Sequence, residues 1–154
     1  MPLSDKILLA YARVGFAGRS PKAPGTCGSL VAIVLAPFIF MPLPFWGRVL
    51  ILLFVLITGT IASSRAETLL QKKDPSEVVI DEVLGQWITC LPFVALAFWE
   101  YLAAFALFRL FDITKPWPVK QLEEIGGGLG IMIDDVAAGI YAMLCLAVLP
   151  ALAG

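Results

Sequence analysis

Long uncharged stretches divide this sequence, and they constrain its fold more than any other feature. No Asp, Glu, Lys or Arg occurs in residues 23–47, 49–64, 83–99 or 136–154. A helix that crosses a bilayer needs about 20 mainly apolar residues. Apolar residues make up 60% of the chain and charged residues 15%, whereas an average soluble domain has about 45–50% and about 25%. These features predict a small integral membrane protein and exclude a disordered chain.

The uncharged stretches predict an all-α fold, in which residues 1–154 form a single domain that is a small membrane-embedded bundle of helices. We expect about four helical segments to lie in the membrane. Three of them are predicted from length and apolarity: residues 30–46, 49–63 and 136–153. Pro37 falls inside the first of these helices and is expected to kink it, because proline lacks a backbone N–H.

The segment 84–111 allows two interpretations. It is long enough to cross the membrane once, or it forms two short helices with a turn near Glu100. Aromatic residues flank Glu100 on both sides, which is typical of a turn at the membrane interface. A lone carboxylate within hydrocarbon would be costly, and this favours the turn.

Composition excludes several classes of function. The chain has no histidine, which removes Ser-His-Asp triads, phosphohistidine intermediates and histidine-ligated zinc. Cys27, Cys90 and Cys145 lie far apart without metal-ligand or disulfide spacing, and we interpret them as small buried apolar residues. The net charge of −1 includes no strongly basic field, so nucleic acid is not an expected partner. The glycine-rich loop of ATP-binding proteins is also missing.

The first polar cluster, residues 24–29, directly precedes the first predicted helix. It contains Thr26 and Ser29, which are favourable N-cap residues, and two glycines that allow a tight turn. Free backbone N–H groups at a helix start attract anions such as phosphate. The same residues are also explained by a plain helix cap.

Two pairs of adjacent acids stand at the edges of apolar segments. Asp81 and Glu82 would suit a hard cation such as Mg²⁺, and equally a favourable interaction with a helix dipole. Asp134 and Asp135 lie between apolar triplets, where mutual repulsion and desolvation are costly unless a cation compensates them. The alternative is a solvated pair just outside the last helix. The glycines of residues 126–130 either cradle a phosphate or form a flexible turn.

Four blocks of the chain together resemble the phosphatidylglycerophosphatase A family: residues 24–30, 79–85, 108–118 and 127–139. The blocks follow the family's order at similar spacing. The resemblance implies a multi-pass enzyme of the bacterial inner membrane, with a phospholipid substrate in the bilayer and no obligatory protein partner. It would hydrolyse phosphatidylglycerophosphate to phosphatidylglycerol and phosphate, with Mg²⁺ as cofactor.

The family's motif acids and its motif threonine fall within these blocks, and a hypothesis for the roles of individual residues follows. The expected metal ligands are Asp81, Glu82, Asp134 and Asp135. The expected catalytic residues are Thr26, Asp81, Asp112 and Asp134. The residues expected to bind the substrate phosphate are Gly25, Thr26, Gly28, Ser29, Arg109 and Lys115. In this hypothesis Asp81 takes a proton from the attacking water. A phosphothreonine at Thr26 is disfavoured because no histidine can activate it.

A single active site requires all four blocks to lie on the same face. One membrane crossing by residues 84–111 would separate the first two blocks from the last two, so we expect this segment to bend near Glu100 and return. Basic residues at the N-terminus and in residues 65–73 predict that this face is cytoplasmic.

Two alternatives remain at this point. Another lipid phosphomonoester, such as phosphatidic acid, would fit the same site, because a site of metal and basic residues serves many head groups. A small membrane cation transporter would also need carboxylates in apolar surroundings. The acids here stand at helix ends beside polar loops, and this favours a site that faces the membrane surface.

Overall fold

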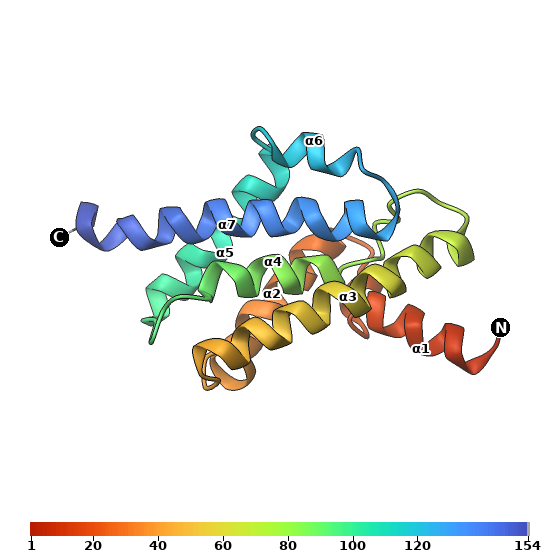
Figure 1. The fold of residues 1–154 in the computed structure, drawn as a ribbon, viewed down its shortest axis with the longest axis horizontal. Helices are drawn as coiled ribbons and strands as arrows, with labels where there is room; N and C mark the ends of the chain where they lie inside the picture. The colour runs from red at the N-terminus through yellow and green to blue at the C-terminus, as the bar shows by residue number, and fades with distance from the viewer. Residues whose placement is uncertain (154) are drawn as a thin grey trace.

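The computed structural model describes residues 1–153, and side chains up to residue 150; within this range it is built of helices and contains no β-strand (Figure 1). In chain order the elements are α1 (Leu3–Ala12), η1 (Ala17–Arg19), α2 (Pro24–Leu35), η2 (Ala36–Phe40), α3 (Phe45–Leu70), α4 (Ile80–Cys90), α5 (Phe98–Thr114), α6 (Val119–Glu123) and α7 (Gly127–Ala153). The predicted all-α class is confirmed.

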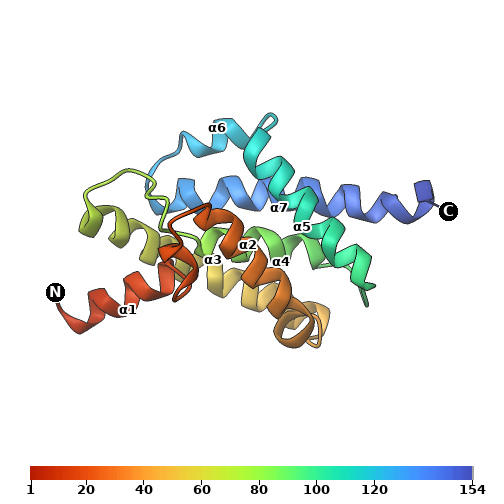
Figure 2. The same ribbon diagram turned by 180° about the vertical axis from the view of Figure 1, so that it is seen from behind.

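Helix α4 lies at the centre of the bundle, and all 11 of its residues are buried. It packs against α3 and α7 and, on the opposite side, against α2 and α5 (Figures 1 and 2). Two glycines permit its close contact with α7. A Cβ added at Gly85 would lie 2.7 Å from the backbone oxygen of Asp135, and one at Gly139 would lie 2.5 Å from the carbonyl oxygen of Gly85. This contact sets α4 and α7 side by side next to Asp135.

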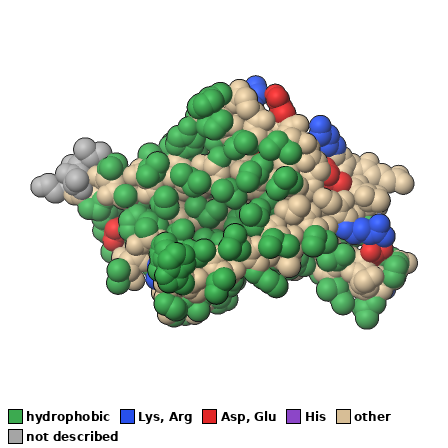
Figure 3. Space-filling model, in the orientation of Figure 1, with side chains coloured by type: hydrophobic (Ala, Val, Ile, Leu, Met, Phe, Trp, Pro, Cys, Tyr) green, Lys and Arg blue, Asp and Glu red, His purple; other side chains and the backbone are tan. Residues whose placement is uncertain are grey.

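Helices α3 and α7 are the two described helices that are long and apolar enough to cross a membrane, over Phe45–Leu70 and Gly127–Pro150. Helices α4 and α5 are shorter, so the expected count of about four membrane segments is not established by length. Figure 3 shows hydrophobic side chains over the middle of the molecule. Most charged side chains visible in that view gather at one end, where α3 ends and α7 begins.

The first and last apolar helices start earlier than their apolar patterns predict. The polar block 24–29 forms the first turns of α2 instead of preceding the helix. Pro37 lies in η2, a π-helical segment that continues α2, so the helix departs from regular α geometry at this proline, while the expected kink stays a prediction. Helix α7 begins at Gly127 rather than at residue 136, and Asp134 and Asp135 therefore lie inside it. Both are buried, which rules out a solvated pair outside the helix.

Residues 84–111 bend, as expected, but at a different place. They belong to α4 and α5, which are joined by residues 91–97, and α5 turns back from the end of α4 (Figure 1). Glu100 lies in the first turn of α5, where its carboxylate accepts a hydrogen bond of 2.8 Å from the backbone N–H of Ala97. The prediction of a turn at Glu100 is therefore wrong by a few residues, because this acid caps the second helix instead of forming the turn.

The side chain of Arg48 holds this turn in place. Its guanidinium donates hydrogen bonds to the carbonyl oxygens of Leu91 and Phe93, at 3.0 and 2.6 Å. It also donates to those of Met41 and Leu43, at 2.6 and 3.1 Å, in the turn before α3. One buried arginine thus connects the turn between α2 and α3 with the turn between α4 and α5.

Candidate active site

The charged residues of the sequence blocks meet at one open cavity of about 460 Å³ beside the first turn of α4. Helices α2, α4, α5 and α7 and the loop before α4 contribute to its wall. Its charged or glycine lining residues are Gly25, Asp74, Asp81, Glu82, Arg109, Asp112, Lys115, Asp134 and Asp135. The expected convergence of the four blocks on one face is therefore present.

The first turn of α4 positions Asp81 and Glu82. The chain before it is anchored to α1, because the backbone N–H of Val79 donates to the carbonyl oxygen of Ala12 at 2.8 Å. Both acids stand at the helix N-terminus, where the dipole favours negative charge. Glu82 accepts a hydrogen bond of 3.1 Å from the hydroxyl of Ser29.

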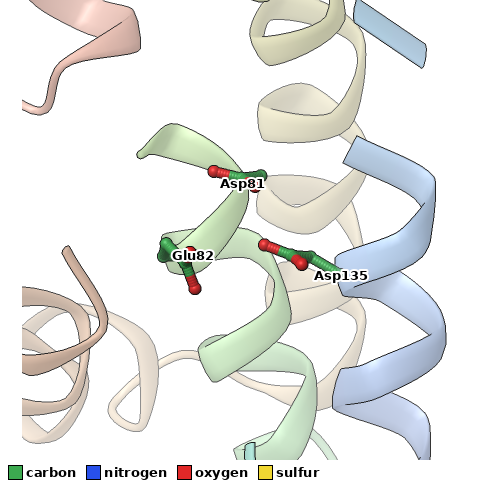
Figure 4. A group of neighbouring side chains, drawn as sticks. All are labelled: Asp81, Glu82 and Asp135. Atoms are coloured by element: carbon green, nitrogen blue, oxygen red, sulfur yellow. The ribbon is translucent and has the colours of Figure 1, made fainter. Parts of the chain in front are cut away.

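Helix α7 brings Asp134 and Asp135 to the same cavity. Figure 4 shows Asp135 reaching from α7 toward Asp81 and Glu82 on α4. Asp135 is 1% exposed, and neither of its carboxylate oxygens has a hydrogen-bond partner in the described part of the chain. Oδ1 of Asp81 and Oδ1 of Asp134 are likewise buried without a partner. Unpartnered buried carboxylate oxygens are costly, and a cation is the ligand that would satisfy them.

Two basic side chains at the end of α5 balance part of this charge. Arg109 donates to Glu82 at 3.2 Å and also pairs with Asp112. Nζ of Lys115 lies 3.0 Å from Asp134 and 3.6 Å from Asp112. Partial burial alone would lower the pKa of Lys115, but the neighbouring carboxylates, Asp134 foremost, outweigh this effect and raise its pKa above the ordinary value.

Burial changes the ionisation of the acids on α4. It raises the pKa of Asp81 to about 8, and the nearby charges of Asp112 and Asp134 act in the same direction. Burial also raises the pKa of Glu82, with repulsion from Asp81 as a further cause. Without a compensating cation, burial and the neighbouring negative charges therefore favour the protonated form of Asp81.

The glycine at the start of α2 allows this helix to approach the charged residues. A Cβ at Gly25 would lie 2.9 Å from Oε1 of Glu82 and 3.3 Å from Nη1 of Arg109. The N-terminus of a 12-residue helix therefore borders the cavity. Such an end favours an anion, which agrees with the predicted phosphate-binding role of this block.

Other members of the block lie behind the cavity wall. Ser29 is fully buried, and its hydroxyl reaches Glu82. A Cβ at Gly28 would lie 2.8 Å from Cβ of Val79, so this glycine permits close packing of α2 on the chain before α4. Thr26 is not among the cavity-lining residues. The geometry indicates supporting positions for Gly28 and Ser29, while the predicted catalytic role of Thr26 stays a prediction.

The glycines of residues 126–130 contribute to helix packing. Gly126 and Gly127 have positive φ angles of 78° and 64° at the turn into α7. The backbone N–H of Gly128 donates to the hydroxyl of Ser64 on α3 at 2.9 Å. Gly126 and Gly127 line a neighbouring cavity and not the one that holds the acids. The run thus serves as a turn and a contact between helices, rather than as a phosphate cradle in the acidic cavity.

One lining residue, Asp74, was not predicted as part of the site. It stands in the loop before α4 and lines both the acidic cavity and the neighbouring one. Burial raises its pKa, and repulsion from Glu123 adds to the effect. The Asp-Pro pair at residues 74–75 indicates only a turn, so the sequence held no signal that distinguished this acid from an ordinary loop residue.

Carboxylate oxygens form two overlapping groups that could each hold a metal ion. The first group is Asp81, Glu82 and Asp135, and the second is Asp112, Asp134 and Asp135. Within each group, one oxygen per residue lies within 4.8 Å of the others. All-oxygen sites of this kind suit Mg²⁺, so the donor set fits the predicted cofactor.

Comparison with known proteins agrees with the geometry. The model of a family described as phosphatidylglycerophosphatase A matches residues 10–150. A protein of Bacteroides thetaiotaomicron named "Putative phosphatidylinositol-3-phosphatase" is 41% identical over 85% of this chain and 86% of its own length. A protein of Escherichia coli named phosphatidylglycerophosphatase A is 37% identical over 84% of this chain and 76% of its own length. A protein of Haemophilus influenzae with the same name is 38% identical over 85% of this chain and 82% of its own length. No solved structure matches the chain.

Proposed function

The chain belongs to the phosphatidylglycerophosphatase A family and is a phosphatase, and we propose that it removes the terminal phosphate of phosphatidylglycerophosphate to give phosphatidylglycerol. One observation of the structure carries the proposal. Residues from four separate blocks gather at one cavity, with five grouped carboxylates, two basic side chains and a helix N-terminus: Gly25, Asp81, Glu82, Arg109, Asp112, Lys115, Asp134 and Asp135. This combination suits a phosphomonoester and a divalent cation.

We propose Mg²⁺ as the cofactor, because the donors are carboxylate oxygens of which four are buried without a partner. The residues that would hold it are Asp81, Glu82, Asp134 and Asp135, with Asp112 as a further ligand. When bound, Mg²⁺ polarises the phosphoryl oxygens and offsets their charge.

The side chains of the cavity have distinct roles in the proposed hydrolysis. Arg109 and Lys115 donate hydrogen bonds to phosphoryl oxygens as these gain charge. Asp112 positions the attacking water, and Asp81 takes its proton while the water oxygen bonds to phosphorus. The bond from phosphorus to the glycerol oxygen breaks, and this oxygen leaves as a hydroxyl with a proton from solvent, to which Asp81 then releases the proton that it accepted.

We further propose that α3 and α7 cross the bacterial inner membrane and that α4 and α5 enter it and return. The surrounding helices shield α4, which supports a half-length segment in this environment. Exposed Trp46 and Phe98 stand at the helix ends remote from the acidic cavity and suit the opposite interface. Basic residues in 65–73 favour a cytoplasmic location of the active site.

Phosphate release by purified protein in detergent tests the reaction. The substrates are phosphatidylglycerophosphate and phosphatidic acid, each with Mg²⁺ and with EDTA. We expect release mainly from phosphatidylglycerophosphate, only with Mg²⁺, and unchanged by Glu124→Gln, which removes an exposed acid outside the site. No release from either lipid by folded protein would contradict the proposal, and an ion-flux assay in vesicles would then test the transporter alternative.

A second substrate belongs in the same assay. The relative named for phosphatidylinositol-3-phosphate is 41% identical to this chain, a higher identity than that of the two phosphatidylglycerophosphatase relatives. Both substrates are phosphomonoesters on a lipid head group, and the cavity groups that contact phosphate would serve either. Preferential release from phosphatidylinositol 3-phosphate would keep the chemistry and change the substrate.

A further inference from the structure

The two groups of carboxylates share a single residue. The α4 group consists of Asp81, Glu82 and Asp135, and the α5 group consists of Asp112, Asp134 and Asp135. Asp135 on α7 is therefore the common member of two sets of ligand atoms that otherwise come from different residues. A carboxylate has two oxygens and can contact two cations at once.

The unpartnered oxygens are distributed over both groups. Asp81 belongs to the α4 group and Asp134 to the α5 group, and Oδ1 of each is buried without a hydrogen-bond partner among the described residues. Asp135 contributes two such oxygens, and its side chain is almost fully buried. A single ion in either group would leave a buried oxygen of the other group without a partner, which is costly.

The charge of the site also exceeds what one ion can balance. With cations bound and all five carboxylates of the two groups ionised, Arg109 and Lys115 leave three negative charges unbalanced, and the nearby Asp74 and Glu123 add to this excess. A phosphomonoester dianion adds about two more at neutral pH. One divalent cation would leave the loaded site strongly negative, whereas two would balance most of this charge, as burial favours.

We propose that Asp135 bridges two divalent cations, one in the α4 group and one in the α5 group. Pairs of cations about 3.5–4 Å apart clamp the attacking and leaving oxygens in many enzymes that transfer phosphate. This inference rests on the proposed function only in that the two cations would serve the proposed release of phosphate. Cation binding itself is measured without any substrate.

Manganese provides the probe, because its spectrum distinguishes a coupled pair from isolated ions. The whole protein in detergent is stripped with a chelator and titrated with Mn²⁺, and bound ions are counted by equilibrium dialysis. We expect two Mn²⁺ per chain and an exchange-coupled electron paramagnetic resonance signal. One tightly bound Mn²⁺ per chain with the spectrum of an isolated ion would overturn the proposal.

Variants of single groups separate the two positions. Glu82→Gln and Asp112→Asn are each expected to reduce binding to one ion and to abolish the coupling, and Asp135→Asn is expected to weaken both positions. Glu124→Gln, outside both groups, should keep two coupled ions. Circular dichroism checks that each variant keeps its helical structure. If one of the two variants misfolds, the variant of the other group provides the test. Coupled ions retained in both Glu82→Gln and Asp112→Asn would contradict the assignment.

The outcomes for the two proposals are distinguishable. Phosphate release by protein that binds a single isolated ion would overturn the bridge and leave the proposed function intact. A coupled ion pair in protein that releases no phosphate from any of the three lipids would support the bridge and overturn the proposed function.

Discussion

Buried charge occurs at both ends of the α4–α5 hairpin, but it is satisfied in opposite ways. At the turn between these helices, Arg48 donates to four backbone carbonyl groups and has no carboxylate partner among the described residues. At the other end, carboxylates outnumber the basic side chains, and four of their buried oxygens have no partner. The guanidinium of Arg48 has its hydrogen-bond partners within the protein and stabilises the fold. At the acidic end, buried carboxylate oxygens lack hydrogen-bond partners among the described residues, which is typical of a site that binds a ligand.

The largest effect is expected from a substitution at the acidic end of the α4–α5 hairpin. Asp134→Asn should lower kcat by about 10³-fold, because it removes a charged cation ligand beside the reacting phosphate. The fold should persist, since the change also removes repulsion between adjacent acids. Phosphate release and thermal unfolding measure the two quantities, with Glu124→Gln as the matched control. Near-normal turnover of Asp134→Asn would refute the role of this residue.

A substitution at the other end of the hairpin, where Arg48 holds the turn, should affect stability rather than activity. Arg48→Ala leaves several carbonyl groups without their donor and should lower the free energy of unfolding by about 3 kcal/mol. The activity of the molecules that remain folded should change little, because Arg48 does not line the acidic cavity. Thermal unfolding in detergent measures the loss. Arg48→Lys is the control: it keeps the charge but lacks the planar fork, so most of the loss should persist.

A smaller effect tests the support behind the acids. Ser29→Ala removes the hydroxyl that donates to Glu82 and should weaken Mg²⁺ affinity or activity about tenfold. Ser63→Ala is a suitable control, because Ser63 is also fully buried but contacts the sulfur of Met132 rather than an acid. Equal losses of Mg²⁺ affinity in the two variants would mean that Ser29 has only a general packing role.

The smallest expected effect concerns pH and metal removal. In EDTA the folded protein holds a proton on Asp81 up to about pH 8, whereas the unfolded chain releases it near its ordinary pKa of 3.8. Stability in EDTA should therefore fall as pH rises from about 4 to about 8. We expect a Tm about 3 °C lower at pH 8 than at pH 6, and a smaller difference with Mg²⁺. A Tm in EDTA that rises over this range would contradict the buried, protonated Asp81.

The fold was predictable where long apolar runs exist. Such runs predicted the central part of α3 (residues 49–63 of Phe45–Leu70) and most of α7 (residues 136–153 of Gly127–Ala153), because the mean hydropathy of a segment does not depend on its tertiary contacts. Helix boundaries were less accurate, since Asp134 and Asp135 are polar residues within a helix. Their burial depends on α4 and α5, which no local pattern describes. The turn at residues 91–97 was displaced from the predicted Glu100 for the same reason: Arg48, distant in sequence, holds it.

The sequence indicated which acids belong to the candidate site better than it indicated what each side chain contacts. Adjacent acids in apolar surroundings are expensive to bury, so Asp81, Glu82, Asp134 and Asp135 stood out from sequence alone. The hydroxyl of Ser29 was expected to contact phosphate, but in the structure it supports Glu82. Asp74 was missed because a turn residue in a polar loop carries no distinguishing signal.

The sequence by itself determined the helical, apolar character of the protein, the blocks of acids and the family to which they belong. These properties follow from residue type and local spacing. Only the tertiary structure decided that α4 and α7 meet through Gly85 and Gly139 and that Asp135 completes both carboxylate groups. Such an arrangement depends on distances between segments far apart in the chain, and these are set by the packing of whole helices rather than by any local sequence pattern.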